Sequence, residues 1–150
     1  LPHLPDLCEA IGALPGRKLV YTNGSRQHAE RVTEYMKLGA SFDGLFGIED
    51  SDYTPKPTQA AYDAFCRHHD VDPGRAVFFE DLERNLAPAH AMGFATVLVH
   101  SAKDWSHEPI EARPASAADA DHPHVDYLTD DLTGFLQGVL GALKPETGLT

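Results

Sequence analysis

Three groups of polar residues that are able to bind an anion or a metal ion each follow a short apolar run. Thr22-Asn23-Gly24 comes directly after residues 18–21, and Glu80-Asp81 comes directly after residues 76–79. Lys56 follows the apolar patch 45–48 after a longer loop. In open α/β sheets, functional groups gather at the carboxyl ends of the strands. We therefore expect all three groups at one rim of a sheet.

Together these side chains suit one task, the binding of a phosphate beside a divalent cation. The Thr22 hydroxyl, the backbone N–H groups of the turn and the Lys56 ammonium would hold a dianionic phosphate. The Glu80-Asp81 carboxylates would hold Mg²⁺, which prefers oxygen ligands and usually acts beside phosphate.

Each group also has an ordinary structural interpretation. Thr22 is a common residue at a strand end, Asn23-Gly24 is a common turn pair, and Lys56 between two prolines fits a solvated loop. Two adjacent acids directly after a buried strand are harder to explain without a cation or a helix to cap. The placement of all three groups near successive strand ends favours the joint functional interpretation.

Alternating helical and apolar patterns predict the elements that position these groups. Helices are expected at 4–14, 27–38, 58–69, 85–92 and 132–143, and strands at 18–21, 45–48, 76–79, 96–99 and 125–128. Pro88 is expected in the first turn of its helix, and Asp130 or Asp131 is expected to cap the last helix. Short all-apolar strands between helices are typical of a parallel sheet covered on both faces. The fold class is therefore α/β, with a three-layer, doubly wound parallel sheet.

Length and composition indicate one domain over residues 1–150, with a helix in residues 1–15 and a long surface loop at 101–124. The formal net charge of −11 argues against nucleic acid polymers and anionic membranes as partners. The sequence contains no signal peptide pattern and no apolar run long enough to span a bilayer. Cys8 and Cys66 fall on apolar helix faces and are expected to be free thiols, which favours a cytoplasmic protein.

At the polar groups the sequence resembles phosphatases of the haloacid dehalogenase superfamily. Residues 18–24 resemble the second motif of that superfamily, an apolar strand ending in Thr or Ser. Lys56-Pro57 resembles the third motif, and residues 77–81 resemble the fourth. The combination of residues 22–25 with residues 80–85 is most similar to the pyrimidine 5′-nucleotidase-like branch. The resemblance implies a Rossmann-like core and Mg²⁺ as cofactor.

The resemblance also implies a role for each phosphate-binding residue. Thr22 would bind the phosphoryl oxygens through its hydroxyl, together with the amides near Asn23 and Gly24. Lys56 would neutralise the phosphate and the attacking carboxylate.

For the metal site, the resemblance implies that Asp81 ligates Mg²⁺ and that Glu80 ligates the ion or orients its water shell. In this superfamily an aspartate attacks phosphorus and forms an aspartyl-phosphate. A second aspartate, two residues later, protonates the leaving alcohol and then activates water.

One departure from the family pattern concerns that nucleophile. The first motif is an apolar strand ending in Asp-x-Asp-x-Thr. Asp50-Ser51-Asp52 and Asp119-Ala120-Asp121 have Asp-x-Asp spacing but follow no apolar strand, and neither does Asp6 or Asp43. The cap that selects the substrate is missing as well. The central strand of the sheet is therefore expected to come from a missing N-terminal segment of the same protein, and residues 1–15 would return from the cap.

The sequence thus predicts that the parent protein is a phosphomonoester hydrolase acting on a small phosphorylated metabolite, with a nucleoside 5′-monophosphate as the expected substrate. Residues 1–150 alone are expected to be inactive. Alternatives within the superfamily are a 2-haloacid dehalogenase and a sugar phosphatase. A receiver-like phospho-acceptor module is disfavoured, because its acidic pair would come first in the chain and its Lys last. A folded fragment without activity is the remaining alternative.

Overall fold

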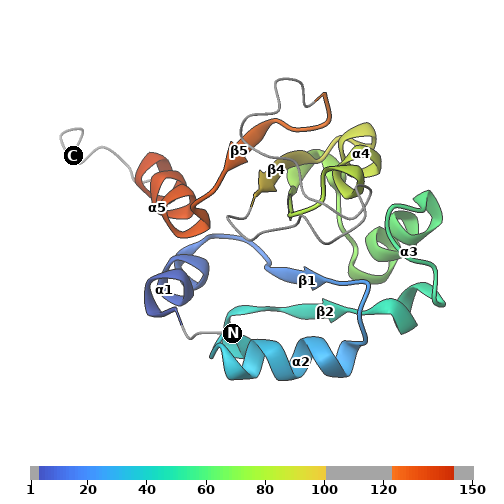
Figure 1. Cartoon of the computed structure of the whole chain (residues 1–150), viewed down its shortest axis with the longest axis horizontal. Helices are drawn as coiled ribbons and strands as arrows, with labels where there is room; N and C mark the ends of the chain where they lie inside the picture. Colours follow the sequence, from blue (N-terminus) through green and yellow to red (C-terminus); the bar gives the residue numbers. More distant parts are fainter. Residues whose placement is uncertain (1–3, 101–122, 144–150) are drawn as a thin grey trace, which may run out of the picture.

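The computed structural model describes residues 4–100 and 123–143, and every strand in these ranges runs parallel to its neighbours. The strands form two sheets, which Figure 1 shows with their helices. One sheet pairs β1 with β2, and the other has the order β3-β4-β5. The bounds are β1 (Leu19–Tyr21), β2 (Gly44–Phe46), β3 (Val77–Glu80), β4 (Ala95–Val99) and β5 (Tyr127–Thr129). The predicted α/β class with parallel strands is confirmed.

The α-helices that alternate with these strands agree with the predicted segments to within three residues at either end. They are α1 (Pro5–Ala13), α2 (Arg26–Tyr35), α3 (Gln59–His69), α4 (Glu83–Met92) and α5 (Leu132–Leu143). Short 3₁₀ turns, η1 (Gly39–Ser41), η2 (Ile48–Ser51) and η3 (Pro73–Arg75), complete the described elements.

Helices pack on both faces of the three-stranded sheet. Phe78 of β3 points into a core with Leu86 of α4, whereas its neighbour Phe79 contacts the ring of Phe135 in α5, at 6.1 Å between ring centroids. Consecutive side chains of a strand point to opposite faces, so α4 and α5 cover opposite sides of β3. Doubly wound packing is therefore present around this sheet.

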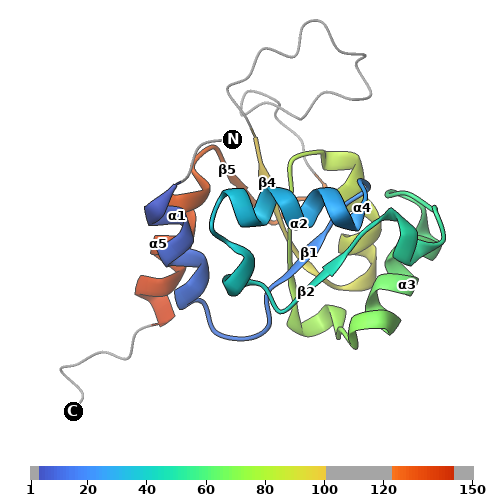
Figure 2. The ribbon, with the colours of Figure 1, turned by 90° about the horizontal axis from the view of Figure 1, so that it is seen from below.

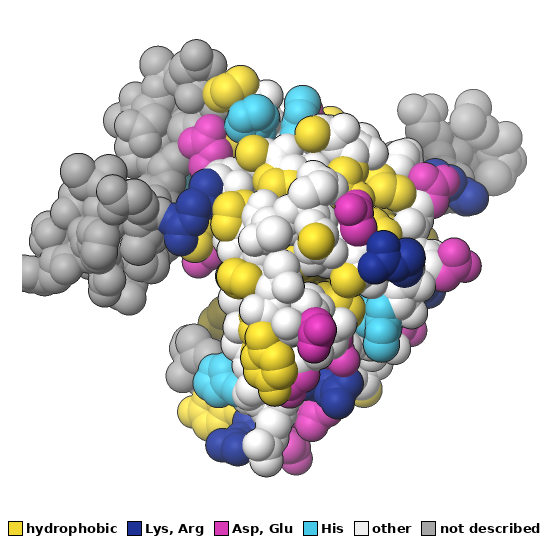
Figure 3. All heavy atoms as spheres, turned by 90° about the vertical axis from the view of Figure 1, so that its right-hand side faces the viewer, with side chains coloured by type: hydrophobic (Ala, Val, Ile, Leu, Met, Phe, Trp, Pro, Cys, Tyr) yellow, Lys and Arg dark blue, Asp and Glu magenta, His cyan; other side chains and the backbone are white. Residues whose placement is uncertain are grey.

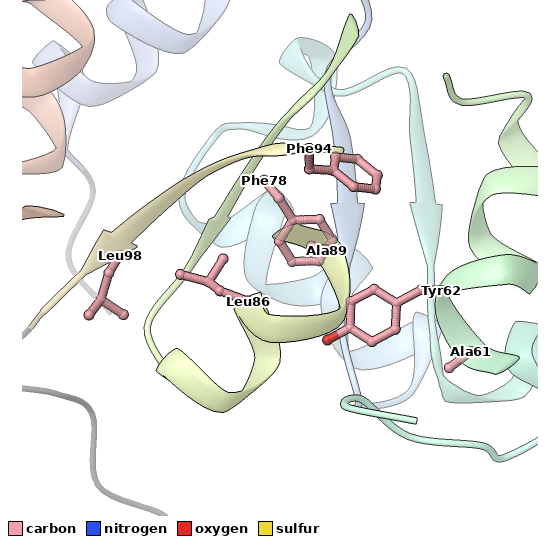
Figure 4. Packing of buried hydrophobic residues seen from close by; sticks show 7 residues of the cluster. All are labelled: Ala61, Tyr62, Phe78, Leu86, Ala89, Phe94 and Leu98. Carbon is pink, nitrogen blue, oxygen red and sulfur yellow. The ribbon is translucent and has the colours of Figure 1, made fainter. Parts of the chain in front are cut away.

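The main core lies between α3, α4 and the three-stranded sheet. Figure 4 shows its buried members, which are Ala61, Tyr62, Phe78, Leu86, Ala89, Phe94 and Leu98. The rings of Tyr62 and Phe78 are stacked with centroids 5.8 Å apart, and the Tyr62 hydroxyl donates to the carbonyl oxygen of Asn85. This contact satisfies the polar end of an otherwise apolar ring.

A second cluster joins the first and last helices of the chain. Leu7 and Ala10 of α1 are buried against Leu136 of α5, and Figures 1 and 2 both show the two helices side by side. The helix α5 begins with a side-chain cap, because Asp131 Oδ1 accepts a hydrogen bond from Gly134 N at 3.0 Å. The predicted cap is thus Asp131 rather than Asp130.

The start of α4 differs from the prediction. The helix begins at Glu83, two residues before the predicted start, so Pro88 lies inside the helix rather than in its first turn. Proline lacks the N–H that would bond to the carbonyl of Arg84 one turn earlier. The helix nevertheless continues to Met92, because Leu86 and Ala89 are fully buried in the core on either side of Pro88. Of the predicted loop 101–124, residues 101–122 lie outside the described residues.

A buried threonine fixes how β5 joins the sheet. Thr96 of β4 is fully buried and accepts a hydrogen bond at its hydroxyl from Asp126 N at 3.0 Å. The Thr96 hydroxyl donates to the carbonyl oxygen of His124 at 2.7 Å, and Thr96 N donates to Asp126 Oδ2 at 2.9 Å. These bonds precede the paired residues of β5 and align that strand with β4.

The turn after β2 anchors the beginning of α2. Gly47 packs so closely on Arg26 that an added Cβ would lie 2.5 Å from the Arg26 backbone N. The Glu49 carboxylate accepts from that same N–H at 3.0 Å, and Asp50 pairs with the Arg26 guanidinium at 2.8 Å. A negative charge at a helix N-terminus is favourable, so η2 both caps and positions α2.

We expect Gly47→Ala to destabilise the fold by about 1–3 kcal/mol, because the neighbouring atoms belong to backbone and cannot rotate away. The free energy of unfolding from urea titration measures this change. Gly138→Ala in α5 is the matched control, because nothing lies within 4 Å of an added Cβ there. That substitution should stabilise the helix by about 0.5–1 kcal/mol. A neutral Gly47→Ala would contradict the packing described above.

Candidate functional site

A pocket of about 470 Å³ opens where β1 and β3 end and α4 begins. Its lining includes five of the six residues that the sequence singled out, namely Thr22, Asn23, Lys56, Glu80 and Asp81. Apolar walls come from Phe79, Leu82, Val99 and Leu132. The three predicted groups therefore lie in one place, although they are far apart in the sequence.

The centre of the pocket is a buried ion pair between Lys56 and Glu80. The Lys56 Nζ lies 2.7 Å from Glu80 Oε2, and the two side chains are only 7% and 8% exposed. The same ammonium donates to the carbonyl oxygen of Tyr21 at 3.3 Å and lies 4.7 Å from the centroid of the Tyr21 ring. The ammonium thus joins the end of β1 to the end of β3.

Several polar groups of the turn after β1 already bond to other groups of the protein, so fewer are available to a phosphate than the sequence predicts. Gly24 N donates to Thr22 Oγ1 at 2.9 Å, so the Gly24 amide is already used within the turn. Thr22 N continues the ladder to β2 by donating to Phe46 O at 2.9 Å. The Asn23 side chain accepts a hydrogen bond from Lys56 N and donates one to Lys56 O. The Thr22 hydroxyl keeps its own hydrogen to donate to a ligand.

The two acidic residues of the pocket titrate in opposite directions. Burial acts to raise the pKa of Glu80, but hydrogen bonds from Asp81 and the nearby Lys56 ammonium lower it below the usual range. Burial, a hydrogen bond with Glu80 and the negative charge of Glu80 together raise the pKa of Asp81 to about 6. The pocket therefore disfavours the ionised form of Asp81, and a bound cation would favour it.

Asp81 and Asn85 offer oxygen atoms that suit a hard divalent cation. Asn85 is 3% exposed and lines the pocket, and its Oδ1 has no hydrogen-bond partner among the described residues. It lies in the first turn of α4, whereas Asp81 precedes that helix by two residues, and both side chains line the same pocket. Glu80 is less available, because Lys56, Asp81 N and Leu82 N already use its two oxygens. In the described part of the chain, no cluster of three or more His, Cys, Asp or Glu side chains suits a metal. These residues can therefore supply only part of a coordination shell.

Sequence reasoning missed two residues of this site. Asn85 has a local signal, since it is a polar residue at the start of the helix predicted after Glu80-Asp81. Tyr21 has none, because an aromatic residue in an apolar strand is expected to serve the core alone. In the structure the Tyr21 ring belongs to both the core and the site. It stacks on the Phe65 ring with centroids 4.7 Å apart, and the Lys56 ammonium lies over its face.

Of the other Asp-x-Asp segments, the structure describes only Asp50-Ser51-Asp52, which does not line the pocket. Asp50 is paired with Arg26 and accepts from Gly47 N, which makes it part of the η2 turn. Residues 119–121 lie outside the described residues.

Comparison with known proteins identifies the family. The sequence pattern of the haloacid dehalogenase-like hydrolases matches residues 1–93. The chain belongs to this family. Its match to an enolase-phosphatase of Frankia alni is 45% identical over 62 residues, which cover 41% of the chain and 25% of the enolase-phosphatase.

Solved structures of the family share the fold. An L-2-haloacid dehalogenase of Xanthobacter autotrophicus, with chloropropionic acid covalently bound, aligns at a TM-score of 0.68 and 19% identity. That alignment covers 91% of this chain and 60% of the dehalogenase. A predicted phosphoglycolate phosphatase of Haemophilus somnus 129pt aligns at 0.65 and 19% identity, over 92% of this chain and 56% of the phosphatase. The chain therefore spans little more than half of the length of these structures.

Charged side chains of both signs lie on the surface of the described residues. On the face that Figure 3 shows, Lys and Arg side chains stand apart, with acidic side chains among them. None of the described helices is long and apolar enough to cross a bilayer.

We expect Asp81→Asn to raise the thermal midpoint in EDTA at neutral pH. The raised pKa means that the folded protein binds this proton more tightly than the unfolded chain does. The stability that Asp81 contributes is present at low pH and is lost as the pH rises from about 4 to above 6. The variant has no such loss, so its advantage over the wild type should grow across this window.

Thermal unfolding at pH 4.5 and pH 7.5 measures the effect. Asp52→Asn, at an exposed position outside the pocket, controls for the removal of one carboxylate. If the thermal midpoints of Asp81→Asn and the wild type differ equally at both pH values, the raised pKa of Asp81 is contradicted.

Proposed function

We propose that this chain forms the phosphate-binding part of a Mg²⁺-dependent phosphomonoester hydrolase. The observation that carries the proposal is the buried Lys56–Glu80 pair, which lies in one pocket with the Thr22 hydroxyl and the Asp81 carboxyl. A fixed cation beside a hydroxyl donor suits a phosphoryl group, and spare carboxyl oxygens suit the metal that accompanies it.

The residues of the pocket divide this work. Lys56 donates to the phosphoryl oxygens and balances their charge, while the Thr22 hydroxyl donates to another oxygen. Asp81 and Asn85 hold Mg²⁺, and Glu80 keeps Lys56 in place. When bound, the metal would act as a Lewis acid that stabilises negative charge on the phosphoryl oxygens. Donors that are fixed before the reaction stabilise the transition state without a cost of reorganisation.

The nucleophile would come from one further strand between β1 and β3. Within the described residues, each of these strands pairs with a neighbour on one side only. At their carboxyl ends the Lys56 ammonium binds the Tyr21 carbonyl of β1 and the Glu80 carboxylate of β3. On β3, Val77 and Phe79 are 55% and 38% exposed, which is unusual for apolar side chains in the middle of a fold. We propose that a segment from elsewhere in the same protein covers them and brings the aspartate that forms the aspartyl-phosphate.

The substrate that we propose is a small phosphorylated metabolite, with a nucleoside 5′-monophosphate as the first compound to test. Names of relatives support a phosphatase, since they include an enolase-phosphatase and a predicted phosphoglycolate phosphatase. The resemblance of residues 22–25 and 80–85 to the pyrimidine 5′-nucleotidase-like branch supports the nucleotide. A cytoplasmic location stays a prediction.

A 2-haloacid dehalogenase is the second candidate, because a structure with that activity and a bound chloropropionic acid shares the fold. The acidic pair and the unpartnered Asn85 oxygen favour the phosphatase, since a metal site suits phosphate chemistry better than halide displacement. Parallel assays of a nucleoside monophosphate and 2-chloropropionate, each with Mg²⁺ and with EDTA, separate the two functions.

We expect Lys56→Met to lower kcat for phosphomonoester hydrolysis by about 10²–10³-fold, the loss that follows removal of one key electrostatic donor. Steady-state kinetics with an active form of the protein measure the change. Lys37→Met removes an exposed lysine outside the pocket and is the matched control. Undiminished turnover in Lys56→Met would exclude the role that we give to the ammonium.

We also expect residues 1–150 alone to lack Mg²⁺-dependent phosphatase activity, because the aspartate that would form the aspartyl-phosphate belongs to the proposed further segment. Addition of the proposed strand, by coexpression or fusion of the segment that carries it, should restore activity and sharpen cooperative unfolding. Activity assays and denaturation curves of both forms test this. An active, cooperatively folded chain of residues 1–150 would require a nucleophile among the residues already present.

A further inference from the structure

Two hydrogen bonds from the Asn23 side chain hold the backbone of Lys56. An ammonium group can bind an anion without such bonds. Asn23 Oδ1 accepts from Lys56 N at 2.8 Å, and Asn23 Nδ2 donates to Lys56 O at 3.3 Å. One side-chain amide thus satisfies both backbone groups of a residue 33 positions away. This pattern matches the pair of bonds that two residues exchange across an antiparallel ladder.

The side chain of Lys56 is held by the residue two positions before Asn23. The Tyr21 carbonyl accepts from the ammonium at 3.3 Å, and the Tyr21 ring lies below it at 4.7 Å. The Tyr21 hydroxyl is buried and has no partner within residues 4–100 and 123–143, while the ring and the carbonyl contact the lysine. A desolvated cation over an aromatic ring gains more than an exposed one.

We infer that Tyr21 and Asn23 are positioning residues for Lys56. Together they form a cradle at the end of β1, in which Asn23 fixes the backbone and Tyr21 fixes the ammonium. An ammonium has three N–H donors. Two are directed at Glu80 and Tyr21 within the described residues, which leaves one for an anion in the pocket. That this anion is a phosphoryl group rests on the proposed function, whereas the cradle itself does not.

The inference gives Asn23 a different role from direct phosphate binding. If Asn23 contacted the substrate itself, its loss would weaken the enzyme whether or not Lys56 were present. If Asn23 acts through Lys56, its loss should matter only while the ammonium is there. Coupled residues of this kind give non-additive effects in a double-mutant cycle.

The first experiment measures the cradle without reference to activity. An amine-acylating reagent is applied to the purified protein, and labelling of Lys56 is compared by peptide mass spectrometry with that of exposed Lys37 in the same sample. Wild-type Lys56 should react more slowly than Lys37. Asn23→Ala should accelerate the labelling of Lys56 about tenfold, as expected when one or two ordinary hydrogen bonds are lost.

Further variants separate the parts of the cradle. Tyr21→Leu should also accelerate the labelling of Lys56, and Tyr21→Phe, which restores the ring, should return most of the protection. Gln137→Ala, which removes an exposed amide on α5, should leave labelling unchanged. Thermal midpoints verify that each variant is folded. If Tyr21→Leu does not fold, the labelling of Asn23→Ala by itself still tests the inference. Equal labelling of Lys56 in Asn23→Ala and the wild type would overturn the inference.

The second experiment is a kinetic cycle of Asn23→Ala and Lys56→Met with a phosphomonoester. Asn23→Ala should lower kcat about tenfold in the wild-type background and have little further effect in Lys56→Met. Additive losses would overturn the inference in favour of direct substrate contact by Asn23. If the protein hydrolyses no phosphomonoester, the proposed function fails, and the labelling experiment still tests the cradle.

Discussion

The ion pair between Lys56 and Glu80 is the interaction on which the arrangement of the site depends. Two charged groups removed from water cost several kcal/mol each unless their geometry and remaining hydrogen bonds compensate. Here the remaining partners are present, since the ammonium also meets Tyr21 and the carboxylate also accepts from the amides of Asp81 and Leu82. The pair therefore connects β1, the loop before α3 and the start of α4 in one network.

The charge of Glu80 also sets the chemistry of its neighbour. Because Lys56 keeps Glu80 ionised, the adjacent Asp81 faces a fixed negative charge and holds its proton to a higher pH. The same arrangement makes Asp81 responsive to a cation, which would favour its ionised form. The core supports this arrangement from below, since the rings of Tyr21 and Phe78 lie 4.7 and 5.8 Å from the ammonium.

Much of this site was predictable because strand ends in a parallel α/β fold are readable from apolar runs. The runs before Thr22 and Glu80 placed both groups at carboxyl ends, and the structure has them in one pocket. Local patterns could not predict that Glu80 pairs with Lys56, because side-chain partners 24 residues apart depend on the tertiary fold. For the same reason local patterns could not predict the hydrogen bonds between the Asn23 side chain and the Lys56 backbone. Proline is expected only in the first turn of a helix, so the sequence predicts a start at Asn85, whereas burial of Leu86 and Ala89 in the core keeps Pro88 inside a helix that begins at Glu83.

The hydrogen bonds between Thr96 and the segment His124–Asp126 have a consequence for the length of the connection before β5. They fix the alignment of β5 at the point where the chain rejoins the sheet, independently of the residues between β4 and that point. Closing a longer connection costs only about 0.6 kcal/mol for each doubling of its length. A change in the length of this connection therefore costs little closure entropy, and we expect the bonds at Thr96 to keep the strand alignment when that length changes.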